Sequence, residues 1–121
     1  MKILLAEDDP FFQSFYSKKL AEQGFEVDIA HDGDEAIKKI ASNTPDVVLL
    51  DLIMPVKDGF EVLSEVKKNI EGKKPPIIVF STLGQNSDIE KALNLGAATY
   101  INKTFFDFDN LLSKVTAVVK N

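Results

Sequence analysis

The sequence feature that most constrains the fold is an apolar run that ends abruptly in an acid. Residues 47–50 read Val-Val-Leu-Leu and are followed at once by Asp51. A run without alternating polar residues is typical of a strand buried on both faces of a parallel sheet. In open α/β sheets ligands bind outside the carboxyl ends of the strands, so we expect Asp51 to meet a ligand. Pro55 and Gly59 predict a loop before the next helix.

The rest of the chain alternates in the same way between apolar runs and helical patterns. Strands are expected at residues 3–6, 25–30, 46–51, 77–80 and 98–102. The helices between and after them are expected to start near Pro10, Asp34, Phe60, Ser87 and Asp107. Five such units predict one α/β domain, residues 1–121, with a parallel sheet covered by helices on both faces.

Capping residues mark several of the helix starts. Asp9 before Pro10 has the pattern of an N-cap, and Asp32 precedes the second helix in the same way. Ser87 and Glu90 have the spacing of a capping box, which predicts the start of the fourth helix.

The first helix carries a set of apolar residues spaced for one face. They are Phe11, Phe12, Phe15, Tyr16 and Leu20. We expect these rings to lie in the core, with Phe12 and Phe15 as the candidates for exposure.

Composition excludes several classes of protein. The formal net charge of -5 argues against a nucleic-acid-binding surface. All positive side chains are Lys, so no guanidinium is present to bind phosphate with two parallel hydrogen bonds. The absence of Cys excludes disulfides and thiolate metal sites. No apolar stretch is long enough to span a membrane and no signal peptide is evident, so a cytoplasmic location is expected.

Polar side chains follow every predicted strand. In chain order they are Glu7 and Asp8, then His31, Asp51, Ser81 with Thr82, and Lys103. If the strand order is 2-1-3-4-5, the first and third strands are neighbours, and their three carboxylates come together. Three carboxylates repel, so either one of them holds a proton or a cation is bound. An all-oxygen site with few carboxylates suits Mg²⁺.

Phosphoryl transfer to Asp51 fits these residue types, because a carboxylate can act as a nucleophile and form an aspartyl phosphate. The metal and Lys103 would neutralise charge on the phosphoryl oxygens. The Ser81 hydroxyl would donate a hydrogen bond to one of them.

Over essentially its full length the chain resembles the receiver domain of two-component response regulators. The matching residues are Glu7-Asp8-Asp9, Asp51-Leu52-Ile53-Met54-Pro55 with Asp58-Gly59, Ser81, and Tyr100-Ile101-Asn102-Lys103. Each motif is weak alone, whereas the ordered set at these separations is specific. The resemblance implies a flavodoxin-like fold of five strand–helix units, with the parallel strands in the order 2-1-3-4-5.

The resemblance also implies a role for each matching residue. Asp51 would accept the phosphoryl group from a histidine kinase or phosphotransfer protein. Asp51 would also be a ligand of Mg²⁺. Asp8 would bind the ion directly, Glu7 mainly through water, and Ile53 through its backbone carbonyl. Asp9, third in the acidic run, is expected to serve only as the helix cap.

On the other side of the pocket, Lys103 would contact the phosphoryl group. Ser81 and Tyr100 would form a switch that reorganises the surface of the fourth helix, fifth strand and fifth helix. Its output would be an effector domain, a downstream protein or a homodimer. No direct contact of this domain with nucleic acid or membrane is expected. The domain would catalyse only its own phosphorylation and slow dephosphorylation.

Two positions depart from the pattern of this family. Thr104 stands where the family usually has a proline in a cis peptide after the lysine, so we expect either a trans Lys103-Thr104 bond or a strained, mobile loop. Thr82 replaces a smaller residue, and Ile53 is bulky. Both would crowd an attacking water, so we expect slow loss of the phosphoryl group.

Three other classes of protein compete with this interpretation. An aspartyl-nucleophile hydrolase would usually carry a second acid where Ile53 stands. A flavin-binding domain would be expected to have a hydroxyl- or glycine-rich loop after the first strand. Here the acidic run that starts at Glu7 would repel the flavin phosphate. A receiver-like interaction module that acts without phosphorylation is the main alternative. His31 is expected to have no catalytic role.

Overall fold

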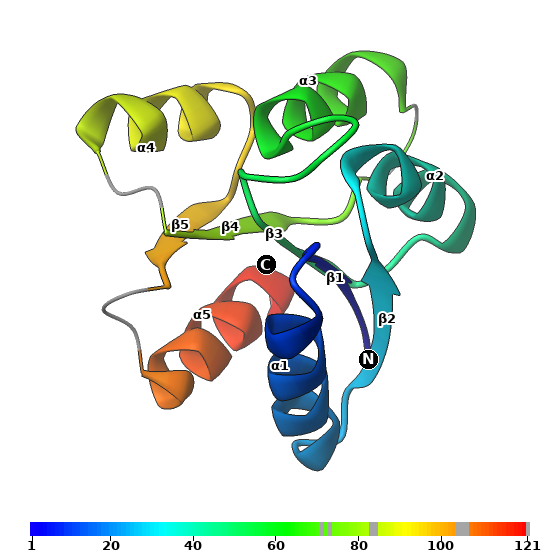
Figure 1. The fold of residues 1–121 in the computed structure, drawn as a ribbon, viewed down its shortest axis with the longest axis vertical. Coiled ribbons are helices and arrows are strands. Elements are labelled where there is room, and N and C mark those ends of the chain that lie inside the picture. The colour runs from blue at the N-terminus through cyan, green and yellow to red at the C-terminus, as the bar shows by residue number, and fades with distance from the viewer. Residues whose placement is uncertain (71, 73, 83–84, 104–106, 121) are drawn as a thin grey trace.

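The computed structural model describes residues 1–70, 72, 74–82, 85–103 and 107–120. Within them, strands alternate with helices along the whole chain (Figure 1). The strands are β1 (Lys2–Ala6), β2 (Glu26–Ala30), β3 (Val47–Leu50), β4 (Ile77–Ser81) and β5 (Thr99–Asn102). The helices are α1 (Pro10–Glu22), α2 (Gly33–Asn43), α3 (Gly59–Asn69), α4 (Asn86–Asn94) and α5 (Phe108–Lys120). None of the described helices is long and apolar enough to cross a lipid bilayer.

All five strands are parallel and lie in the order β2-β1-β3-β4-β5, which confirms the expected topology. In the register of β1 and β3, Ala6 lies opposite Leu50. The ladder extends one step further, because the Asp51 N–H donates to the Ala6 carbonyl at 3.1 Å. The first residues after β1 and β3 therefore leave the sheet side by side.

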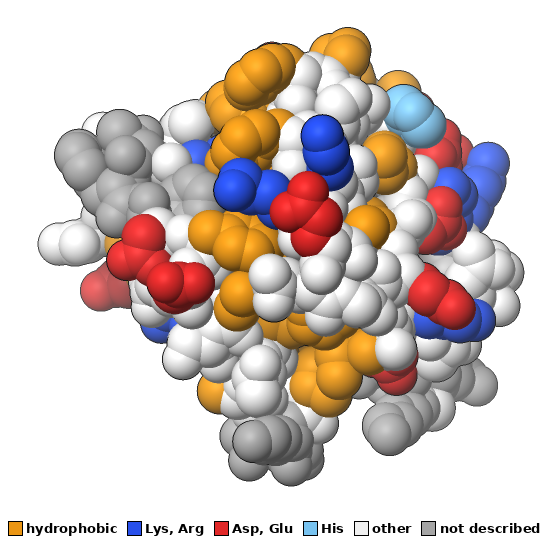
Figure 2. All heavy atoms as spheres, turned by 90° about the horizontal axis from the view of Figure 1, so that it is seen from below, with side chains coloured by type: hydrophobic (Ala, Val, Ile, Leu, Met, Phe, Trp, Pro, Cys, Tyr) orange, Lys and Arg blue, Asp and Glu red, His pale blue; other side chains and the backbone are white. Residues whose placement is uncertain are grey.

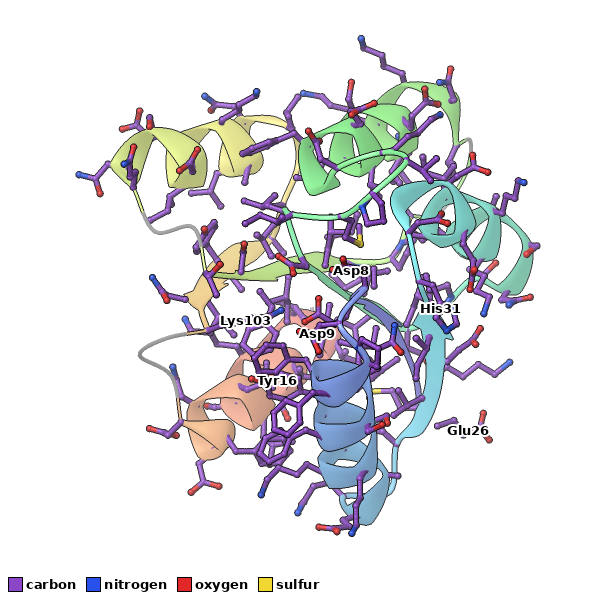
Figure 3. All side chains as sticks on the ribbon, in the orientation of Figure 1. Asp8, Asp9, Tyr16, Glu26, His31 and Lys103 are labelled. Atoms are coloured by element: carbon purple, nitrogen blue, oxygen red, sulfur yellow. The ribbon has the colours of Figure 1, made fainter. Side chains whose placement is uncertain are left out.

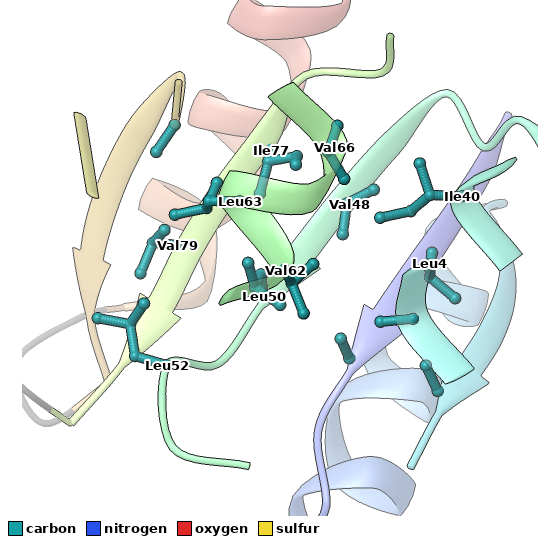
Figure 4. Close-up of a cluster of buried hydrophobic side chains, with 14 of the residues drawn as sticks. Leu4, Ile40, Val48, Leu50, Leu52, Val62, Leu63, Val66, Ile77 and Val79 are labelled. Atoms are coloured by element: carbon teal, nitrogen blue, oxygen red, sulfur yellow. The ribbon is translucent and has the colours of Figure 1, made fainter. Parts of the chain in front are cut away.

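Helices cover both faces of the sheet, α1 and α5 on one side and α2, α3 and α4 on the other (Figure 1). Strand β3 is central, and its four side chains have no solvent exposure. Val48 and Leu50 pack under α2 and α3 in one cluster (Figure 4), whereas Val47 and Leu49 pack under α1 and α5 in the other. The uninterrupted apolar run of β3 is thus explained by burial on both faces.

The acidic helix caps are confirmed where aspartate was expected. The carboxylates of Asp9 and Asp32 accept hydrogen bonds from backbone N–H groups in the first turns of α1 and α2. The predicted cap at Ser87 is wrong. The Gln85 carbonyl already accepts the Ile89 N–H at 3.1 Å, which places Ser87 inside the first turn of α4.

The prediction that the apolar residues of α1 lie in the core is only partly correct. Tyr16 and Leu20 are buried, and Phe15, a candidate for exposure, is 41% exposed. Phe11, which was expected in the core, is 67% exposed. The rings of Phe11 and Phe15 stack on each other, with their centres 6.0 Å apart. Figure 2, a view onto the α1 and α5 side, shows hydrophobic side chains exposed at the surface between charged ones.

A substitution at Gly59, the first residue of α3, can test how closely this helix approaches the loop after β3. A Cβ atom built on Gly59 would lie 2.6 Å from the Asp51 carbonyl oxygen and 2.7 Å from Leu52 Cα. Because both are backbone atoms, we expect Gly59→Ala to lower the free energy of unfolding by about 2 kcal/mol. Urea unfolding measures the loss. Lys68→Ala, exposed on the same helix, should leave the stability unchanged, and equal stability of the two variants would contradict the close approach.

Candidate functional site

Three carboxylates meet where β1 and β3 end. Glu7, Asp8 and Asp51 each offer one oxygen atom, and these atoms lie within 4.8 Å of one another. Glu7 and Asp51 are buried, whereas Asp8 is exposed at the start of the segment that leads to α1 (Figure 3). The parallel pairing of β1 with β3 explains the cluster, as the sequence predicted.

Lys103 reaches this cluster from the end of β5. Its Nζ atom donates hydrogen bonds to Glu7 Oε1 at 2.5 Å and to Asp51 Oδ2 at 3.1 Å. The side chain is only 5% exposed. A second contact fixes its backbone, since the Lys103 N–H donates to the Ser81 carbonyl at 2.9 Å. A buried ammonium needs such partners, because an unpaired one would lose its hydration without compensation.

The cluster keeps an excess of acceptor atoms. Glu7 Oε2 is buried and has no hydrogen-bond partner among the described residues. Burial raises the pKa of Glu7 to about 7; the neighbouring Asp51 carboxylate adds to this effect, and Lys103 opposes it. A bound cation would supply what the unpartnered oxygen lacks. The all-oxygen donor set fits Mg²⁺.

The loop after β3 holds the Asp51 carboxylate from the other side. The Ile53 N–H donates to Asp51 Oδ1 at 3.1 Å, and the Ile53 side chain is 52% exposed. The loop then turns tightly at Val56, whose φ of 69° is rare for a β-branched residue. The Lys57 N–H closes this turn by donating to the Pro55 carbonyl at 2.8 Å.

Ser81 and Tyr100 lie beside the cluster on β4 and β5. Ser81 is fully buried. The Tyr100 ring packs against the core on the α3 and α4 side, and its buried hydroxyl has no hydrogen-bond partner among the described residues. Burial raises the pKa of Tyr100, with a contribution from Asp88. The Ser81 side chain acts in the opposite direction and lowers the pKa of Tyr100.

The other polar residues at this sheet edge lie outside the cluster. Asp9 Oδ1 accepts the Phe11 N–H at 2.8 Å, which is the expected capping role. Thr82 is exposed directly after β4. His31, at the end of the edge strand β2, contacts Glu35 at 3.1 Å (Figure 3). Thr104, and with it the predicted trans peptide, lies outside the described residues.

Sequence reasoning missed Gln13. Its Nε2 atom donates to the Glu7 carbonyl at 2.6 Å and so ties α1 to the acidic segment. The signal was its place in the first turn of a helix, because helical side chains tilt toward the N-terminus. It also missed the aromatic rings of Phe12 and Phe80, which lie 5.0 Å and 5.4 Å from Lys103 Nζ.

The raised pKa of Glu7 predicts a particular pH dependence of stability in magnesium-free buffer. The pKa of about 7 in the folded state lies above the value of 4.5 for an unperturbed glutamate, so the folded state holds the Glu7 proton more tightly. This contribution is complete below about pH 4.5 and is lost as the pH rises to about 7. We expect a loss on the order of 3 kcal/mol in urea unfolding. Glu7→Gln removes the titration, and an undiminished slope in that variant would contradict the assignment.

Comparison with known proteins agrees with this geometry. The family model of the response regulator receiver domain matches residues 3–116. The response regulator ArlR of Staphylococcus saprophyticus is 34% identical over 98% of this chain, and the match covers 52% of that protein. The chain therefore spans about half the length of this curated relative.

Solved structures show the same fold. The BeF3-activated N-terminal receiver domain of Klebsiella pneumoniae RstA is 30% identical, with a TM-score of 0.91 over the full length of both chains. The receiver domain of the sensor histidine kinase PA1611 from Pseudomonas aeruginosa, with a magnesium ion coordinated in its active-site cleft, is 28% identical. Its TM-score is 0.89, over 99% of this chain and 98% of that one. The chain belongs to the response regulator receiver domains of two-component signalling.

Proposed function

We propose that this domain accepts a phosphoryl group on Asp51 from a phosphohistidine of a histidine kinase or phosphotransfer protein. The observation that carries the proposal is the buried contact of Lys103 with both Asp51 and Glu7. It places a fixed positive charge beside a carboxylate at the carboxyl edge of the sheet. Lys103 supplies positive charge at this site and is not proposed to act as an acid or a base.

In the proposed reaction an Asp51 carboxylate oxygen attacks phosphorus. The bond between phosphorus and the donor imidazole nitrogen breaks, and its electron pair returns to the imidazole. Lys103 and the Ser81 hydroxyl donate hydrogen bonds to the oxygens of the arriving group. The Ile53 N–H keeps the carboxylate oriented during the attack, through its present contact at 3.1 Å.

Glu7, Asp8, Asp51 and the Ile53 carbonyl would hold Mg²⁺, which would supply positive charge against the carboxylates and the phosphoryl oxygens when bound. Support comes from the unpartnered Glu7 Oε2 atom and from the carboxylate spacing of this chain. The related PA1611 receiver domain, whose structure contains a coordinated magnesium ion, adds support from outside the chain.

The added charge would be read out through Ser81 and Tyr100. A phosphorylated Asp51 draws the Ser81 hydroxyl toward it and changes the space next to the Tyr100 ring. This shifts the population of conformers at the surface of α4, β5 and α5. The recipient would be an effector domain, a separate protein or a second copy of this chain. The curated relatives are about twice as long as the matched region, which gives room for an effector.

Phosphorylation by a small donor tests the proposal. Incubation with acetyl phosphate and Mg²⁺ should add one phosphoryl group, seen by intact mass, and EDTA should prevent it. Asp51→Asn should abolish the adduct, and Lys103→Met should slow its formation at least tenfold. Asp9→Asn is the matched control, because Asn is an equally good N-cap and Asp9 lies outside the cluster.

No adduct on the wild-type protein, or an undiminished one on Asp51→Asn, would refute the proposal. The first result would favour an interaction module that acts without phosphorylation.

The lifetime of the phosphoryl group is expected to depend on Ile53 and Thr82, which follow β3 and β4 at the same edge of the sheet. Both side chains are exposed, and we propose that they would crowd an attacking water. We expect the aspartyl phosphate to persist for minutes or longer, and the double variant Ile53→Asn with Thr82→Ala to lose it several-fold faster. Loss of the adduct is followed by mass after removal of the donor. A half-life of seconds in the wild-type protein would contradict this expectation.

A further inference from the structure

The Lys103 ammonium has aromatic neighbours as well as its carboxylate partners. Its Nζ atom lies 5.0 Å from the ring centre of Phe12 on α1 and 5.4 Å from that of Phe80 on β4. Both distances are within the range in which a cation is attracted to the face of an aromatic ring. Because the lysine side chain is only 5% exposed, little water competes with this attraction.

A third ring locks these two rings together. Phe12 stacks on Tyr16 at 5.7 Å and 15° between ring planes. Tyr16 meets Phe80 edge-on at 4.9 Å and 76°. Phe12, Tyr16 and Phe80 are called the aromatic cluster below. Tyr16 and Phe80 are buried, so the cluster is anchored in the core between α1 and the sheet. Figure 3 labels Tyr16 and Lys103.

The carboxylate partners of Lys103 change during phosphoryl transfer, whereas the rings do not. When Asp51 becomes an acyl phosphate, the oxygen that now accepts from Lys103 Nζ loses its full negative charge. A lysine side chain is long and flexible, and it would gain freedom at that moment. The ring faces keep the same electrostatic character throughout, so they can hold the ammonium in place before and after the transfer.

We propose that Phe12, supported by Tyr16 and Phe80, is a positioning residue that holds the Lys103 ammonium for phosphorylation of Asp51. The inference rests on the proposed function. Phe12 is the informative member of the cluster because it is only half-buried. Substitution of the fully buried Phe80 would disturb the core as well.

Phosphorylation by acetyl phosphate measures the effect without a docked partner protein. We expect Phe12→Leu, which keeps an apolar side chain but removes the ring face, to lower the rate about fivefold. Phe12→Tyr keeps the ring face and should restore at least half of the rate. Phe15→Leu is the matched control on the same helix, because the Phe15 ring lies under Lys19 and not under Lys103. A wild-type rate in Phe12→Leu, or an equal loss in Phe15→Leu, would overturn the inference.

A double-mutant comparison separates positioning from a general structural role. In a Lys103→Met background the ammonium is absent, so adding Phe12→Leu should cause no further loss of rate. The same fivefold loss in both backgrounds would show that Phe12 acts independently of Lys103 and would overturn the inference.

A second readout requires no phosphorylation. The ε-methylene protons of Lys103 should be shifted upfield in NMR spectra of the unmodified protein by the ring current of Phe12. The shift should shrink in Phe12→Leu and persist in Phe12→Tyr. If the wild-type protein takes up phosphoryl groups but Phe12→Leu leaves this shift unchanged, the inference alone fails. If the shift behaves as expected but no donor phosphorylates the wild-type protein, the proposed function fails, and the positioning role with it.

Discussion

The contact of one ammonium with two buried carboxylates is the interaction on which the site depends. Glu7, Asp51 and Lys103 directly follow three different strands, and the parallel order of the sheet brings them to one point. Removing these charges from water is costly, and the mutual contacts offset that cost only while the geometry is kept. The hydrogen bonds from Ile53 and from Gln13 serve this purpose, because each holds one part of the acidic cluster in place.

Most of the fold could be predicted from the sequence, for reasons that are local. The apolar runs of β1, β3 and β4 admit few other interpretations, since segments this short and this apolar are rarely exposed. Asp9 and Asp32 cap their helices through a hydrogen bond that involves only the next two or three residues. The meeting of the three carboxylates then followed from strand order, which the family resemblance supplied.

What the sequence did not reveal depends on contacts between distant parts of the chain. The start of α4 was misplaced because the Ser87–Glu90 spacing cannot tell which backbone carbonyl accepts first. The exposure of Phe11 depends on how much of α1 the sheet can cover. Phe12 is separated from Lys103 by most of the chain, and Phe80 is separated from it by α4 and β5, so no short-range pattern could indicate these rings.

The register between β1 and β3 has a consequence for folding itself. Shifting β3 by one residue would exchange the side chains that face α2 and α3 with those that face α1 and α5. The same shift would move Asp51 by about 3.3 Å along the strand, away from Glu7. A molecule with this error could not bring the three carboxylates within the 4.8 Å found here. Any cation that binds the cluster would therefore bind only molecules in which β1 and β3 are correctly paired. Such binding would shift the equilibrium toward the correctly paired sheet.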